Sequence, residues 1–404
     1  MKLAELKHQV RLNLDRLGGL THSEPIHVAV ANRLKHVVRG AVISKAVLPV
    51  IYAPRLKKYS AQPGPADKFK FLVLRYRYAD FADEQSGPGA EEHVVSAPLR
   101  AANIGEVAEY YYDIDHSQGV FGDRTLVDMV MQTRPDVIIL SSYNHQRNIN
   151  PNFEVIKSIR AYCQIPVVVI WHDTLAVDPL NYFAYLSSGT DLNIIMDSDF
   201  LADQSTVGAD FIRMAPTLDD NLFRVGDVAP DIPVSFVGST SGYRSVRKEY
   251  LTYLYQQGVE VLLAGGMENR ISIEEYADVI RRSKISLNFS FSIPGTHQIK
   301  ARVLEATMSN SLLLESKNSE TSRFFTPMAD YVEFESKEDL VDKVRYYLEH
   351  EDERREIALN GHRKALKEYN HHVYWGRMVA KLKELNLLVD SQQPMAAKAK
   401  ASHS

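Results

Sequence analysis

Two cations and a carboxylate are grouped within the run HQIKARVLEATMS, residues 297–309. Lys300 and Arg302 come first, and Glu305 follows one helical turn after Arg302. Thr296, a good N-cap, precedes the run, so the sequence predicts a helix that begins there. Unpaired N–H groups at a helix start and nearby cations suit phosphate groups, and a carboxylate can accept two hydrogen bonds from ribose hydroxyls. The pattern indicates a nucleotide diphosphate site; an amphipathic helix with ordinary surface charges is the alternative.

Two glycine-containing turns follow apolar runs in the same half of the chain. Gly238 and Ser239 end the run VSFVGS, where backbone N–H groups could approach a phosphate. Arg244 and Arg247 come next and could reach a leaving diphosphate; a tight turn followed by helix-surface arginines is the alternative. The run VEVLLAGG ends in Gly265-Gly266, which could admit a nucleobase or pyrophosphate closely or could be a plain turn.

A histidine and an aspartate end an apolar run in the N-terminal half. His172 and Asp173 follow IPVVVIW, and either side chain has the type needed to take a proton from an acceptor hydroxyl. A backbone-bound histidine with an aspartate that caps the next turn is the alternative. Residues 197–199 read Asp-Ser-Asp, a metal-binding spacing that is frequent by chance, and we predict no metal site.

Alternating strands and helices must position these groups. A Pro- and Asp-rich connection, 214–233, separates two such alternating series. The expected strands are 69–76, 136–143, 165–173, 191–199, 234–239, 259–266, 284–292 and 311–316, while 105–114 is either a helix end or a strand. The expected helices are 125–135, 153–163, 178–190, 244–258, 272–283, 297–309, two within 337–369, and one around 374–387. Continuous apolar strands in this alternation predict parallel sheets covered on both faces, which bind ligands beyond the carboxyl ends of their strands.

Residues from about 234 to 380 resemble the C-terminal domain of the glycosyltransferase group 1 superfamily, in the branch that includes the CgeB spore-maturation proteins. The matching runs are VSFVGS, RSVRKEYLTYL, ISLNFS, IKARVLEATMSNSLLLES, YVEF, EDLVDKVRYYL and ERREIALNG. The resemblance implies a GT-B fold of two Rossmann-like doubly wound domains. It also implies a nucleotide-sugar donor in the C-terminal domain and an acceptor in the N-terminal domain.

Two positions within the resembling segment bear on the site. The resemblance implies that Glu305 matches the ribose-binding glutamate of the superfamily. Retaining members carry a second glutamate eight positions earlier, where this chain has His297, so the stereochemistry of transfer is left open. Asn310 stands where relatives usually have glycine, and asparagine tolerates the left-handed backbone expected at a helix end.

The domain organisation follows from these patterns and from the resemblance. We expect a helical extension at 1–62, an acceptor domain at 63–220, a donor domain at 221–373, a helix at 374–387 that returns to the first domain, and a disordered tail at 388–404. The extension contains a basic, acid-free stretch at 33–58. A helix packed on the domain behind it is one interpretation, and peripheral contact with an anionic membrane is the other.

Composition limits the remaining classes of function. The formal net charge is -4, so no basic field argues for a nucleic-acid partner. A single cysteine, Cys163, fits a reducing compartment. No run has the length and apolar character of a membrane-spanning helix. We therefore expect a cytoplasmic protein, with peripheral contact at the inner membrane face left open.

The predicted function is transfer of a sugar from a nucleotide-sugar donor to a hydroxyl acceptor on a glycan, a lipid-linked glycan or a protein. The reaction is expected to need no metal and no cofactor beyond the nucleotide-sugar co-substrate. One alternative is a non-catalytic nucleotide-sugar-binding protein, which His297 favours. The other is a GT-B nucleotide-sugar epimerase, which would turn over donor without an acceptor.

Overall fold

The structure is a computed structural model of the 404-residue chain. It describes residues 48–59, 68–80, 82–117, 123–143, 151, 153–173, 189–196, 210–240, 245–266, 270–291 and 297–388. Contacts divide the chain into two units, one formed by Met1–Ser60 and Asn152–Gln164, the other by Ala61–Pro151 and Ile165–Ser404. Among the described residues, no helix has both the length and the apolar character needed to cross a membrane.

The smaller unit contains two helices that pack on each other, α3 (Leu48–Leu56) and α7 (Phe153–Cys163). At one end the Cys163 Sγ atom lies 3.8 Å from the carbonyl oxygen of Leu56. Helix α7 has the predicted bounds. Most of the basic stretch 33–58 lies outside the described residues, so its contact with a membrane stays a prediction.

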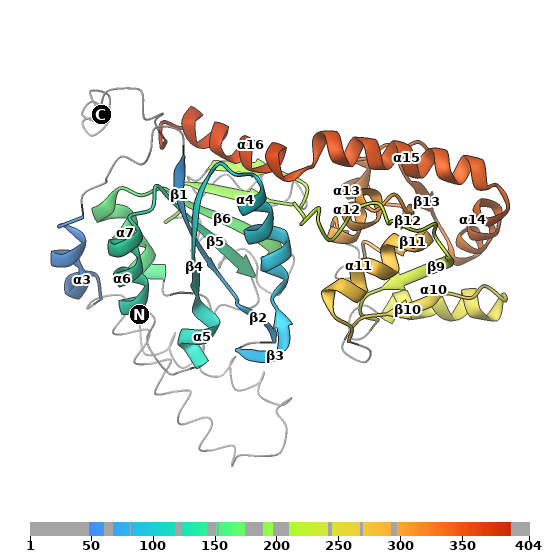
Figure 1. The fold of residues 1–404 in the computed structure, drawn as a ribbon, viewed down its shortest axis with the longest axis horizontal. Coiled ribbons are helices and arrows are strands. Elements are labelled where there is room, and N and C mark those ends of the chain that lie inside the picture. Colours follow the sequence, from blue (N-terminus) through green and yellow to red (C-terminus); the bar gives the residue numbers. More distant parts are fainter. Residues whose placement is uncertain are drawn as a thin grey trace, which may run out of the picture. The chain divides into compact units, whose positions relative to one another are not determined.

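The first sheet of the larger unit has six parallel strands in the order β4-β1-β5-β6-β7-β8. Its strands are β1 (Phe69–Arg75), β4 (Gly105–Tyr111), β5 (Val137–Tyr143), β6 (Val167–Asp173), β7 (Leu192–Ile195) and β8 (Asp210–Arg213). The segment 105–114, which the sequence left open, is a strand followed by helix α5 (Tyr112–Ser117). Helices α4 (Ala97–Ala101) and α6 (Asp123–Thr133) lie on opposite sides of the sheet (Figure 1).

Sequence periodicity missed three short strands, one π-helical turn and the short helix α4 in this part of the chain. The three strands are β8 and the two strands of an antiparallel hairpin, β2 (Tyr78–Asp80) and β3 (Asp83–Pro88). The turn η2 (Glu92–Ser96) leads directly into α4. The three strands are partly exposed, and η2 and α4 have five residues each, so none shows the apolar period that reveals a longer element.

The second sheet of the larger unit has five parallel strands in the order β10-β9-β11-β12-β13. Its strands are β9 (Ile232–Val237), β10 (Leu262–Ala264), β11 (Ser283–Asn288), β12 (Leu312–Ser316) and β13 (Val332–Phe334). Its helices are α10 (Ser245–Gln256), α11 (Ile273–Arg281), α12 (Ala301–Met308), α13 (Ser319–Ser322), α14 (Lys337–Glu349) and α15 (Glu351–Glu368). Alternate strand residues face two apolar clusters, one with α10 and α14 and the other with α11 and α12.

In each sheet the first strand along the chain lies between the next two. Strand β1 lies between β4 and β5, and β9 lies between β10 and β11. The order reverses between β1 and β5 in the first sheet and between β9 and β11 in the second. Ligands of doubly wound sheets bind beyond the carboxyl ends of the strands at such a point. The predicted α/β class with two Rossmann-like parallel sheets is confirmed.

Helix α12 begins later than predicted. Its N-cap is Lys300, so the prediction of a helix that starts beside Thr296 is wrong, although Thr296 itself lies outside the described residues. Residues before it run extended against the end of β11: His297 forms an antiparallel bridge with Phe291, and the Gln298 N–H donates to the Ser290 carbonyl over 3.0 Å. This strand-like pairing requires extended backbone angles, which exclude the helical angles that another turn would need.

Caps define the other helix ends near the second sheet. Ser272 and Glu275 form a reciprocal capping box at the start of α11. Asn310 has φ +58° after α12, which confirms the predicted left-handed residue.

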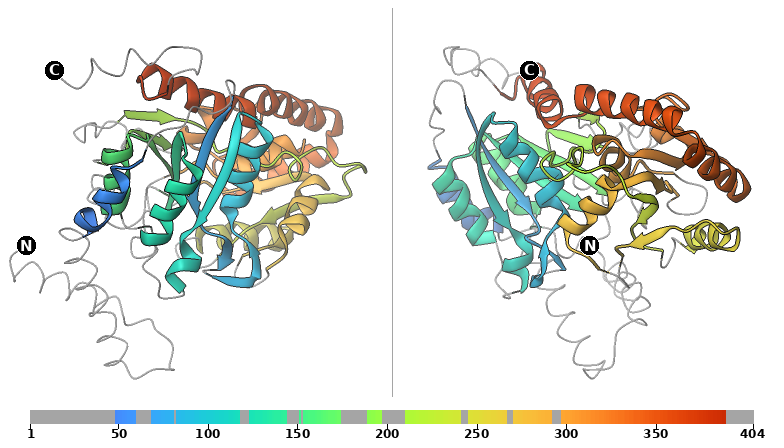
Figure 2. Two further views of the ribbon diagram at one scale, coloured as in Figure 1. Left: turned by 60° about the vertical axis from the view of Figure 1, so that its left-hand side comes forward. Right: turned by 45° about the vertical axis from the view of Figure 1, so that its right-hand side comes forward.

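The last described helix, α16 (His371–Glu384), follows α15 (Figure 2) and places the Lys383 ammonium 5.7 Å from the Phe69 ring centroid on β1.

Candidate functional site

Arg302 joins three elements at the carboxyl end of the second sheet. Its Nη1 donates to the Asn288 Oδ1 at the end of β11 over 2.8 Å, and its Nη2 donates to the Tyr276 hydroxyl on α11 over 3.4 Å. Its guanidinium carbon lies 5.2 Å from the centre of the Phe236 ring on β9. The predicted phosphate-binding cation therefore lies at the point where the order of the second sheet reverses.

Glu305 lies one turn beyond Arg302 and is linked to it through a tyrosine. The Tyr276 hydroxyl donates to Glu305 Oε2 over 2.6 Å. The Glu305 side chain is buried, and burial raises its pKa, opposed by the charge of Arg302 and by the Tyr276 hydrogen bond. Sequence reasoning missed Tyr276, because it lies 29 residues before Glu305 and only the packing of α11 beside α12 brings the two together.

Gly238 allows the loop after β9 to approach Arg302 closely. It has φ +146°, and a Cβ atom at this position would lie 2.5 Å from Arg302 Nη2. The second glycine turn lies against the first: a Cβ atom at Gly266, where φ is +83°, would lie 3.0 Å from the Cα of Ser239. The two predicted turns are thus adjacent, and glycine is required in both for backbone reasons.

Arg247 is buried, unlike a helix-surface arginine. Its Nη1 donates to the Ser239 carbonyl and its Nη2 to the Phe289 carbonyl, each over 3.1 Å. It therefore holds the ends of β9 and β11 together, and contact with a diphosphate stays a prediction. Arg244 lies outside the described residues.

The extended residues before α12 connect this cluster with the first sheet. The Lys300 ammonium donates to the Gln298 side-chain oxygen, and the Gln298 amide donates to the His172 carbonyl over 3.3 Å. His297 lies with its ring centre 5.4 Å from that of Phe291, and burial lowers its pKa. Lys300 and His297 therefore lie beside the start of α12, on the chain that leads to Arg302.

A buried carboxylate that the sequence did not single out supports Asn288. Glu315, at the end of β12, accepts hydrogen bonds from the Asn288 amide and, over 3.1 Å, from the Ser290 N–H. Burial raises its pKa, opposed by these hydrogen bonds. Its signal in the sequence was a charged residue inside an apolar strand, a residue type that is seldom buried without partners.

His172 lies at the carboxyl end of β6, where the sequence predicted an acid–base group. Its Nε2 lies 2.8 Å from the Ser141 Oγ on β5. Burial lowers its pKa to about 4, so the ring is neutral at pH 7. The Asp173 side chain and residues 197–199 lie outside what the structure describes, so their predicted roles stay untested.

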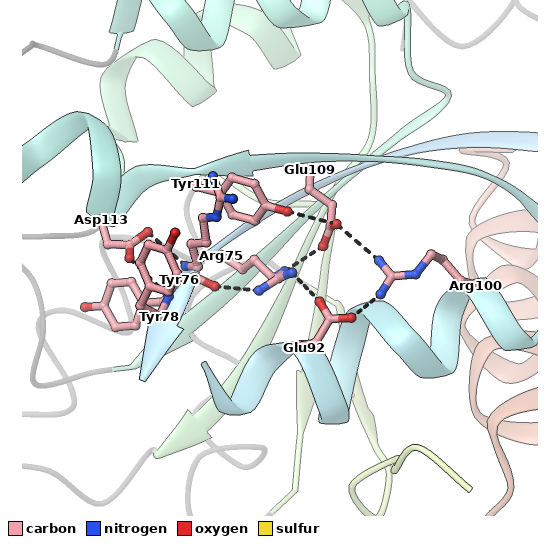
Figure 3. Close-up of polar contacts among 9 residues, drawn as sticks. Arg75, Tyr76, Tyr78, Glu92, Arg100, Glu109, Tyr111 and Asp113 are labelled. Atoms are coloured by element: carbon pink, nitrogen blue, oxygen red, sulfur yellow. Dashed lines mark hydrogen bonds and ion pairs between the residues drawn. The ribbon is translucent and has the colours of Figure 1, made fainter. Parts of the chain in front are cut away.

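Four charged side chains form a closed network at the carboxyl ends of β1 and β4 (Figure 3). Arg75 donates to Glu92 and, over 2.6 Å, to Glu109, and Arg100 donates to the remaining oxygen of each carboxylate. Arg75 is only 3% exposed, whereas Arg100 is 42% exposed. The four residues lie on η2, α4 and two strands, so no sequence spacing could have revealed this network. It holds η2 and α4 against β1 and β4.

Comparison with known proteins is consistent with this geometry. Residues 225–380, which contain the whole second sheet, match the family described as glycosyl transferase-like. A search for curated relatives by sequence finds no match.

Solved structures share the fold at low identity. HepE of Anabaena in complex with UDP-glucose is 14% identical, with a TM-score of 0.52 over 78% of this chain and 100% of that one. A glycosyltransferase from Rickettsia africae ESF-5 is 10% identical, with a TM-score of 0.54 over 79% and 99%. The sucrose-phosphate synthase of Thermosynechococcus elongatus is 10% identical, with a TM-score of 0.52 over 78% and 100%. The predicted two-domain α/β fold of GT-B glycosyltransferases is therefore confirmed.

Proposed function

We propose that the protein is a glycosyltransferase that takes a sugar from a uridine diphosphate sugar and transfers it to an acceptor hydroxyl. The observation that carries this proposal is the group formed by Arg302, Glu305 and Gly238 at the reversal point of the second sheet. The family match over 225–380 supports sugar transfer, and the HepE complex with UDP-glucose supports the choice of nucleotide. Group 1 membership in the CgeB-like branch is part of the same proposal.

The donor would be held through its phosphates and its ribose. Arg302, Lys300 and the N–H groups that begin α12 supply positive charge where the diphosphate leaves, as an electrostatic clamp does in phosphoryl and glycosyl transfer. Glu305 would accept hydrogen bonds from ribose hydroxyls through the oxygen that Tyr276 does not use. The proposed reaction thus takes its cations from the chain and needs no metal, which activity in the presence of a chelator tests.

The transfer step would join the acceptor oxygen to the anomeric carbon while the bond to the β-phosphate oxygen breaks. The nucleotide diphosphate leaves with the electron pair of that bond. In an inverting reaction the acceptor proton needs a base, and neutral His172 would receive it directly or through the Ser141 hydroxyl. We place the acceptor, on a glycan or another hydroxyl carrier in the cytoplasm, at the first sheet for this reason.

Nucleotide binding tests the proposal most directly. UDP, GDP, ADP and CMP are compared by thermal shift, since a ligand that binds the folded state raises its melting temperature. We expect UDP to give the largest shift and Glu305→Gln to remove most of it. Glu356→Gln, an exposed position on α15, is the matched control.

Turnover separates the proposal from its two rivals. Release of UDP from UDP-sugars, with sugar appearing on an acceptor, is expected for a transferase. Binding of UDP-sugar without any turnover would favour a non-catalytic protein, the alternative that His297 suggested. Conversion of the sugar without an acceptor would favour an epimerase. No shift with any nucleotide would reject the proposed donor site.

A further inference from the structure

Arg77 holds its guanidinium between two tyrosine rings just beyond the end of β1. The guanidinium carbon lies 5.2 Å from the ring centre of Tyr78 and 5.3 Å from that of Tyr111, at the end of β4. The side chain is exposed. Stacking against aromatic faces fixes a planar guanidinium while its edge nitrogens stay open to a ligand.

A buried carboxylate fixes the backbone of this segment. Asp113 is fully buried and accepts the Arg77 N–H over 2.9 Å, the Tyr78 N–H over 3.3 Å and the Ala82 N–H over 3.4 Å. Figure 3 shows Asp113 beside Tyr76 and Tyr78, next to the four-residue network. Both the ring contacts and the backbone of Arg77 are therefore held before any ligand arrives.

Glu92 and Glu109 do not pair with the Arg77 guanidinium. Glu92 and Glu109 are engaged by Arg75 and Arg100, so the charges of that network cancel. Within the described part of the chain, the Arg77 guanidinium makes no hydrogen bond or ion pair. A fixed guanidinium with open N–H donors matches the paired oxygens of a carboxylate or phosphate.

We propose that Arg77, with Tyr78 and Tyr111, binds the anionic group of an acidic glycan acceptor, a sugar chain that carries a carboxylate or a phosphate. The proposal rests on the proposed function, which places the acceptor at the carboxyl edge of the first sheet. Strands β1 and β6 are separated there only by β5, so their ends lie about 10 Å apart. Arg77 packs against Tyr111 on β4, one strand further from β6, so the anionic group lies about 10–15 Å from the hydroxyl that reacts beside His172.

Glycan arrays test the proposal with three sets of oligosaccharides: neutral, uronic-acid-containing and phosphorylated. Binding of the labelled full chain in the presence of UDP, and transfer from UDP-sugars, are measured for the wild type, Arg77→Gln and Arg77→Lys. The matched control is Arg363→Gln, an exposed arginine on α15. The two acidic sets decide whether the anionic group is a carboxylate or a phosphate.

We expect the wild type to prefer an acidic set and Arg77→Gln to lose about 10- to 100-fold on it, as expected when a charged hydrogen-bond partner is removed. Arg77→Lys should lose less, and Arg363→Gln should match the wild type. The UDP thermal shift should be the same in all four proteins, which separates this proposal from failure of the donor site. Equal binding of neutral and acidic glycans by the wild type, no binding of acidic glycans, or an acidic preference retained by Arg77→Gln would overturn it.

Discussion

The carboxyl edges of the two sheets carry charged clusters of different design. In the first sheet, Arg75 and its partners form a closed ring in which two guanidinium groups neutralise two carboxylates. In the second sheet, Arg302 and Glu305 are not ion-paired with each other among the described contacts, and Tyr276 bridges them. The first network thus completes its own charge balance, whereas the second holds a cation and a carboxylate that do not pair directly with each other.

Because of this difference, we expect substitutions in the first network to change stability and substitutions in the second cluster to change ligand binding. Removing a member of a closed, partly buried ion network leaves charges without partners and should cost folding free energy. Removing a member of the open cluster should chiefly weaken ligand binding, because neutral hydrogen-bond partners remain for its neighbours. Five substitutions sharpen this contrast.

Replacing Arg75 tests the closed network. Arg75→Met leaves Glu92 and Glu109 with Arg100 alone, and we expect a loss of about 3–5 kcal/mol in the free energy of unfolding. Arg100→Met removes the exposed cation and should cost about 1 kcal/mol or less. Urea unfolding measures both. Equal losses at the two positions would contradict the contrast between a buried and an exposed member of this ring.

Replacing Arg302 tests the open cluster. Arg302→Met should lower kcat/KM for donor turnover about 100- to 1,000-fold, the range for loss of one group that stabilises developing charge. Arg363→Met is the exposed control. Steady-state kinetics on folded protein, checked by circular dichroism, gives the result. If Arg302→Met lowers stability but its folded protein turns over donor normally, Arg302 belongs with the structural networks instead.

Glu91 contrasts with its charged neighbour Glu92. It is fully buried, and burial raises its pKa to about 7. The unfolded chain ionises near the ordinary value while the folded chain stays neutral, so stability falls as pH rises from about 4.5 to about 7 and is level above. Glu91→Gln should remove this slope, worth up to about 3 kcal/mol. Unfolding free energies of both proteins at pH 4.5 and 8 check it, and an unchanged slope would count against a neutral buried carboxyl.

Tyr276 should have the smallest effect and show how open the second cluster is. Tyr276→Phe removes the hydrogen bond that the phenol donates to Glu305, worth about 1 kcal/mol, and the longer one that it accepts from Arg302. If the phenol positions the carboxylate for ribose, UDP affinity should fall about fivefold, with little change in kcat. Isothermal titration with UDP measures the change. Tighter binding would instead show that the phenol competes with the ribose hydroxyl for Glu305.

Much of the fold and part of the site could be predicted from local sequence. Continuous apolar strands alternating with amphipathic helices identified both parallel sheets, because burial on two faces needs that composition. The pair Arg302 and Glu305 was found because one helix turn sets their separation. Gly238 and Gly266 were found because strand ends that approach other groups closely need glycine.

Contacts between distant segments were decided only by the tertiary structure. Tyr276 reaches Glu305 through the packing of two helices, and Arg75 meets its partners from three other elements, so no spacing in the chain records either contact. The start of α12 also depended on another element, because pairing with the chain just after β11 holds the preceding residues in an extended conformation. Residue type and period specify which elements form, but the partners of a buried polar group depend on which elements pack side by side.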